Sequence, residues 1–218
     1  MNKYIYHSYK DLKRTHIPAL KSFVKWTLIS ILIGVVVGLI GSAFNYSIKE
    51  VSSIRERYPI IIMFMAFGGV AITWIYQILG LPHDRGTNMV LTAVRDGKNL
   101  TLKNMVCIFV GTVITHLFGG SSGREGAGLQ IGGSIASSIG TAFKMNKSDE
   151  RIITMCGMSA GFSALFGTPV TAGFFAMEVI SIGILHYSAI VPCMIASTIS
   201  MLISSKLGGE RVFYDVIF

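Results

Sequence analysis

The residues best suited to chemistry lie in one glycine-rich stretch, Gly119–Gln130. Arg124 and Glu125 are the only Asp, Glu, Lys or Arg residues between Asn104 and Phe143. A charge within an apolar, membrane-like sequence costs on the order of 3 kcal/mol, so such charges generally mark functional sites. Arg124 and Glu125 are therefore the first candidate functional residues.

The residues around this pair are suited to binding a small anion. We expect a helix to begin here, and the free N–H groups and the dipole at a helix N-terminus favour negative charge. Glycines at this point let backbone amides face a ligand without a side chain in the way. The predicted anion-binding residues in this stretch are Gly123, Arg124, Gly126 and Ala127.

Glu125 has two interpretations at such a place. As a gate, it occupies the anion site when ionised and leaves the site to a mobile anion when protonated, so one residue also carries the proton. As a structural residue, it pairs with Arg124 and caps the helix. A phosphate-binding loop is disfavoured, because the stretch lacks a Gly-Lys-Ser/Thr ending and a carboxylate would repel phosphate.

The whole chain is too apolar for a soluble domain. Of its 218 residues, 51% are hydrophobic and 14% are charged, against about 25% charged in typical soluble domains. Six runs without Asp, Glu, Lys or Arg are 18–27 residues long, and about 20 apolar residues cross a bilayer as a helix. Because lipid offers backbone amides no hydrogen-bond partner, we predict an all-α, multi-pass membrane protein. The runs are Trp26–Ile48, Tyr58–Pro82, Asn104–Gly123, Gly126–Phe143, Ile152–Met177 and Val179–Ser205.

The positive charge of the chain predicts its orientation. The formal net charge is +8, and residues 1–25 carry six Lys or Arg against a single Asp. The positive-inside rule then places the N-terminus in the cytoplasm, and we expect a bacterial plasma membrane. Nucleic acid is not an expected partner, because the basic residues flank the spans and do not form one face.

Three parts are expected along the chain. Residues 1–21 are predicted to form an amphipathic helix at the cytoplasmic membrane surface, with a break marked by Pro18. Residues 22–207 form the transmembrane part, and residues 208–218 begin a connection to a further part. Within the transmembrane part, a stripe of small residues that begins with Gly128 predicts a helix packed closely against protein.

Several predicted helices are too short to cross a bilayer or are interrupted. A short helix is predicted at Thr87–Arg95, and breaks at 119–126 and 166–169 interrupt apolar sequence. Unwound backbone at membrane depth is tolerated only where protein or a water-filled cavity covers it. Transporters build ion sites from half-helices that meet near the midplane, so this pattern favours ion transport.

The motifs of this region resemble the first half of a CLC anion channel or transporter. They are Gly123-Arg-Glu-Gly126, Gln130-Ile-Gly-Gly133, and the segment Ala160–Pro169 followed by Glu178. The similarity extends over about residues 30–205. The resemblance implies that the Gly-Arg-Glu-Gly stretch opens a helix aimed at the anion site and that Glu125 is the gate.

The same resemblance implies a protein built from two inverted-topology halves, with short, tilted and broken helices, and assembled as a homodimer. The chain corresponds to the first repeat, so a missing C-terminal half or a second copy is an expected partner. The other expected partners are membrane lipid, a chloride or fluoride ion, and a proton. No cofactor or metal is expected.

Three departures from the family pattern bear on the anion and on proton coupling. Thr87 or a backbone N–H stands where chloride members usually have a serine ligand, and Ala127 replaces a proline. Val179 follows Glu178, where proton-coupled chloride exchangers often carry a second glutamate. Val179 resembles the channel members of the family, and all three departures also resemble its bacterial fluoride-exporting branch, so chloride and fluoride both remain candidates. Glu178 is either a packing carboxylate or part of a path for protons or water.

Two other classes of function compete with anion transport. An intramembrane enzyme would use Glu125 and His116 as acid and base, but the sequence has no metal-ligand pair and no pair of carboxylates in one site. A non-conducting subunit would keep the fold without the activity. We therefore predict a transporter or channel and not an enzyme.

Overall fold

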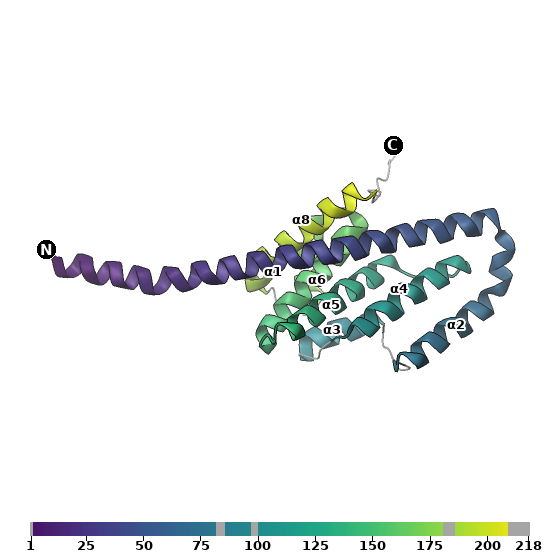
Figure 1. Ribbon diagram of the computed structural model, residues 1–218, viewed down its shortest axis with the longest axis horizontal. Helices are drawn as coiled ribbons and strands as arrows, with labels where there is room; N and C mark the ends of the chain where they lie inside the picture. The colour runs from purple at the N-terminus through teal and green to yellow at the C-terminus, as the bar shows by residue number, and fades with distance from the viewer. Residues whose placement is uncertain (1, 82–85, 97–99, 181–185, 209–218) are drawn as a thin grey trace.

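The computed structural model describes residues 2–81, 86–96, 100–180 and 186–208, with side chains from Leu20 onward except that of Thr87. In these ranges the regular secondary structure is helical, which confirms the predicted all-α fold (Figure 1). Of the expected connection at 208–218, all but Gly208 lies outside the described ranges. The elements are α1 (Asn2–Arg57), η1 (Pro59–Phe64), α2 (Met65–Ile78), α3 (Thr87–Asp96), α4 (Leu102–Leu117), α5 (Arg124–Ala142), α6 (Lys147–Phe166), α7 (Pro169–Glu178), η2 (Tyr187–Ala189) and α8 (Ile190–Lys206).

The described chain combines full-length apolar helices with half-length ones. Three helical stretches are long and apolar enough to cross a membrane, namely Leu20–Arg57, Pro59–Ile78 and Tyr187–Lys206. By contrast, α3 and α7 have ten residues each. Ten helical residues rise only about 15 Å, roughly half the thickness of the hydrocarbon core. The predicted mixture of spans and short helices is therefore present.

The first helix corrects one expectation from the sequence. The break predicted at Pro18 is absent, because α1 continues as one helix from Asn2 through Arg57. Figure 1 shows its N-terminal part extending beyond the other helices. A proline removes one backbone hydrogen bond and disturbs the preceding turn, but the turns on either side keep their own bonds. The expected boundary after residue 21 is thus not a helix boundary, and the surface location of residues 1–21 stays a prediction.

Glycine contacts join α5 to α6 at the centre of the bundle. Gly132 on α5 lies against Gly157 on α6, and a Cβ atom on either residue would overlap the carbonyl oxygen of the other. Gly161 meets the Gly128 carbonyl in the same way. Small residues at this spacing let two helix backbones touch. The structure confirms the prediction that this stripe packs against protein.

Buried serine residues fix α8 to α6. The Ser200 hydroxyl donates to the Ala160 carbonyl at 2.8 Å, and the Ser204 hydroxyl donates to the Ala164 carbonyl at 2.6 Å. α1 packs against α8 as well, since a Cβ atom added to Gly38 of α1 would lie 3.1 Å from the Cα of Ser200. Since α6 also carries the glycines that hold α5, these contacts position the start of α5 relative to the long helices.

Candidate anion-binding site

The start of α5 has the open backbone that the sequence predicted. α5 begins at Arg124, and its N-cap, Gly123, is extended, with no side chain accepting a hydrogen bond from the first turn in the described part of the chain. The preceding turn uses Gly119 at a φ of 82°, a left-handed conformation that glycine adopts without strain. The first amides of a helix lack an intrahelical acceptor. They are therefore available to an anion.

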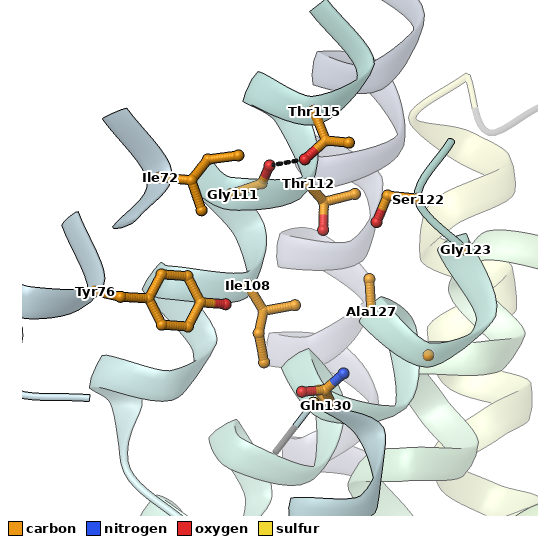
Figure 2. A pocket seen from close by; sticks show the side chains of 12 residues that line it. Ile72, Tyr76, Ile108, Gly111, Thr112, Thr115, Ser122, Gly123, Ala127 and Gln130 are labelled. Carbon is orange, nitrogen blue, oxygen red and sulfur yellow. Dashed lines mark hydrogen bonds between the residues drawn. The ribbon is translucent and has the colours of Figure 1, made fainter. Parts of the chain in front are cut away.

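A cavity of about 430 Å³ lies beside this helix start, between α2, α4 and α5 (Figure 2). Figure 2 shows Tyr76 entering from α2, Thr112 from α4, Ser122 from the stretch before α5, and Gln130 from α5 itself. The described lining holds no Asp, Glu, Lys or Arg. Hydroxyl and amide groups donate hydrogen bonds without a fixed charge, so the cavity suits a small anion and its water. The lining residues are Ile72, Tyr76, Gly86, Ile108, Gly111, Thr112, Thr115, Ser122, Gly123, Gly126, Ala127 and Gln130.

Two helix starts open on this cavity. Gly86 precedes α3 and has a φ of 60°, while Gly123 and Gly126 belong to the start of α5, and all three line the cavity. The positive ends of both helix dipoles are thus near the same space. The backbone of Thr87 opens α3, but its side chain lies outside the described part, so its role as a ligand remains a prediction.

The predicted site residues divide into those that line the cavity and those at its edge. Gly123, Gly126 and Ala127 line it. Arg124 and Glu125 are exposed and do not. The Glu125 carboxylate nevertheless stays close, because its Oε2 would lie 3.3 Å from a Cβ atom built on Gly123.

The structure also bears on the predicted capping pair and on the position of Glu178. Arg124 and Glu125 form no ion pair with each other in the described structure, so the interpretation of a capping pair has no such contact to support it. Glu178 is exposed at the end of α7 and is not among the residues that line the cavity. The structure therefore does not bring Glu178 and Glu125 together in one cavity.

Sequence reasoning missed the polar residues that α2 and α4 contribute. Tyr76 and Thr112 carried no motif, and only the fold brings them to the start of α5. Ser122 lies in the glycine-rich stretch itself but was not proposed as a site residue. Gln130 was quoted as part of a motif but was not proposed as a site residue, although it is buried. A polar side chain within an apolar run was the available signal, since buried polar groups need partners.

Comparison with known proteins identifies the class of protein to which the chain belongs. Residues 68–217 match the family model described as voltage gated chloride channel. The chain therefore belongs to this family, the CLC channels and transporters. A crystal structure of a CLC-type fluoride/proton antiporter is similar to the chain with a TM-score of 0.81 and 32% identity, over 90% of this chain and 51% of that one.

Curated relatives include both channels and exchangers. A protein of Pseudomonas syringae pv. tomato, called chloride/fluoride channel protein, is 33% identical over 193 residues, which are 88% of this chain and 43% of that protein. The H(+)/Cl(-) exchange transporter ClcA of Citrobacter koseri is 29% identical over 188 residues, 77% of this chain and 39% of that protein. The chain thus spans less than half the length of these two relatives.

Proposed function

We propose that the complete protein transports a small halide anion across a membrane and that it exports fluoride in exchange for protons. The observation that carries this proposal is the 430 Å³ cavity on which the starts of α3 and α5 open. Its neutral hydroxyl and amide lining suits a small, strongly hydrated anion, because such donors can replace water molecules one by one. The similarity to a fluoride/proton antiporter supports the choice of fluoride and of proton coupling.

In this proposal Glu125 is the gate and the proton carrier. Its carboxylate lies beside Gly123, at the edge of the cavity, and is exposed. An ionised carboxylate competes with an anion for the free amides and the dipole at the start of α5. When it is protonated, its charge no longer repels the anion, and the amides become available. Access of the anion to the site is then linked to the protonation state of Glu125.

Chloride/proton exchange is the second candidate. It is favoured by the similarity to an H(+)/Cl(-) exchange transporter. The departures at Thr87, Ala127 and Val179 favour fluoride instead. Both candidates use the same cavity and the same gate, so a measurement of fluoride and chloride flux is needed to distinguish them.

We propose that the N-terminus lies in the cytoplasm of a bacterium. Lys25 of α1 pairs with Asp149 of α6 at 2.9 Å, and Arg151 of α6 donates to the Arg95 carbonyl of α3 at 2.9 Å. These three basic residues are therefore at one end of the bundle, together with the exposed Lys147 at the start of α6. The positive-inside rule assigns this end to the cytoplasm.

The test is reconstitution of the complete protein in liposomes, with fluoride efflux, chloride efflux and internal pH recorded in parallel. We expect fluoride efflux to exceed chloride efflux and to move protons in the opposite direction. Chloride efflux with proton movement would favour the second candidate. If neither anion moves faster than in liposomes without protein, the chain belongs to a non-conducting member of the fold.

A further inference from the structure

A second, smaller pocket lies near the start of α6, far from the cavity at the start of α5. α5 has 19 residues and is therefore about 28 Å long, and a short loop joins its end to the start of α6. The pocket has a volume of about 170 Å³ and is lined by residues of α3 and α6, by Ile180 just beyond α7 and by His186 just before η2. The residues that line it are Val94, Arg95, Arg151, Met155, Ile180 and His186.

Backbone carbonyls hold the two arginines of this pocket in place. The Arg95 guanidinium donates from Nε to the Ile180 carbonyl, just beyond the end of α7. Arg151 donates from Nη2 to the Arg95 carbonyl in the last turn of α3 at 2.9 Å. Cations are favoured at helix C-termini, which explains why both residues are there. A guanidinium has five N–H donors, so one such bond leaves most of its donors for another acceptor.

The positive charge of this pocket is not balanced by carboxylates in its lining. Among the described residues that line it, two are arginines, one is a histidine and none is acidic. Three acids are close in sequence, Asp96, Asp149 and Glu150, and none of them lines the pocket. Asp149 accepts a hydrogen bond from Lys25 at 2.9 Å. Both arginines are exposed, so an anion that enters the pocket meets two positive charges that no lining carboxylate neutralises.

We propose that this pocket binds a phosphate group, either that of an anionic phospholipid or inorganic phosphate. Planar guanidinium groups match phosphate oxygens in bidentate geometry, and His186 adds a third polar group. Basic pockets between transmembrane helices are suited to anionic lipid headgroups. Val94, Met155 and Ile180 are buried in the protein core and form the inner wall of the pocket. A volume of 170 Å³ is about that of six water molecules, enough for a phosphate group.

The experiment uses the complete protein and has two arms. In detergent, binding of inorganic phosphate is measured by calorimetry. In nanodiscs that contain phosphatidylcholine and phosphatidylglycerol, retained phosphatidylglycerol is counted by native mass spectrometry. Neither readout depends on halide transport, so a failure of the proposed transport function and a failure of this inference are distinguishable.

The variant Arg151→Gln tests the site, and Lys147→Gln is its control. Lys147 is exposed four residues earlier on α6 and does not line the pocket, so its removal lowers the surface charge equally. We expect Arg151→Gln to weaken the binding of phosphate or of phosphatidylglycerol about tenfold or more, because the change removes charge-assisted hydrogen bonds. Lys147→Gln should leave the binding of both unchanged. Arg151→Lys keeps the charge and covers the case in which the glutamine variant does not fold. It should bind less tightly than the unaltered protein because lysine lacks the planar fork.

The two arms separate the possible sources of phosphate. An effect of Arg151→Gln on phosphatidylglycerol alone identifies a lipid headgroup, and an effect on inorganic phosphate alone identifies a soluble ligand. Absence of binding in both arms overturns the proposal. Equal losses in Arg151→Gln and Lys147→Gln also overturn it, because they would mean general attraction to a basic surface.

Discussion

At the residue scale, Glu125 differs from the polar residues of the cavity in both position and charge. It is exposed at the edge, whereas Thr112 and Gln130 line the interior. Protonation of Glu125 therefore changes the charge at the cavity mouth without changing the donors inside. This division of roles is what a gate requires, since the binding groups remain in place while access changes.

Glu125→Gln mimics the protonated side chain at this position. We expect the variant to lose proton movement driven by a fluoride gradient, because glutamine cannot release a proton. The flux that remains should depend little on pH between acidic and neutral conditions. Liposomes that contain the complete protein, with fluoride and pH recorded together, provide the measurement.

Glu56→Gln is a suitable control for this change. Glu56 is an exposed acid in the last turn of α1, outside the cavity lining, and its replacement should leave coupling intact. A Glu125→Gln protein that still drives protons against their gradient would show that Glu125 only caps the helix.

Thr112→Val removes one hydroxyl from the cavity and keeps the shape of the side chain. If the hydroxyl donates to the anion, its loss should slow fluoride efflux about tenfold, since hydrogen bonds to charged groups contribute about 1.5–3 kcal/mol. Thr73→Val is the matched control, because the Thr73 hydroxyl is exposed and donates to the Gly69 carbonyl of its own helix. Equal fluoride efflux from the two variants would show that the Thr112 hydroxyl does not bind the anion.

Sequence reasoning found the part of the site that is local in the chain. Gly123 and Gly126 flank the only charges of a long apolar stretch, and that contrast is visible in the residues alone. Tyr76 and Thr112 reach the same cavity from other helices. Their position depends on how α2 and α4 pack, which no local pattern specifies.

At the scale of elements, the join between α6 and α7 shows what local chemistry determines. Gly167 ends α6 with a φ of 68°, a left-handed cap that favours glycine, and Pro169 opens α7 where its missing N–H costs nothing. Both residues are visible in the sequence, and the break predicted at 166–169 is present. Pro18 gave a similar signal, yet α1 continues through it, because a single proline weakens a helix without necessarily ending it.

Gly132→Ala tests the contact that joins α5 to α6. The added Cβ would meet the carbonyl of Gly157, and backbone atoms cannot move aside as a flexible side chain can. We expect a loss of about 1–3 kcal/mol in stability, as for other overpacked cores, seen as a lower midpoint of thermal unfolding. Gly69→Ala is the control, since no atom lies within 4 Å of its added Cβ. Unchanged stability of Gly132→Ala would mean that α5 and α6 can separate without cost.

At the scale of the whole molecule, much of the apolar surface has no protein cover within the described chain. Only 6% of the apolar stretch Pro59–Ile78 is buried. Phe67, Val70 and Trp74 of this stretch are each more than 60% exposed, and Val170 and Phe174 are exposed on α7. Apolar side chains exposed together in this way mark contacts with membrane or protein. Lipid, a second half and a second copy are the partners we propose for them.

The last prediction concerns residues 1–218 produced without any further chain. Within the described chain, α2, α4 and α5 line the cavity at the start of α5. A selective anion path must enclose its ion on all sides, because an open site lets water compete with every hydrogen-bond donor. We therefore expect these residues alone to give no fluoride-selective flux in liposomes. Co-production with the remainder of a full-length CLC relative, supplied as a separate chain, should restore some flux. Selective, proton-coupled flux from a purified monomer of residues 1–218 would contradict this prediction, and it would mean that the donors around one cavity suffice for transport.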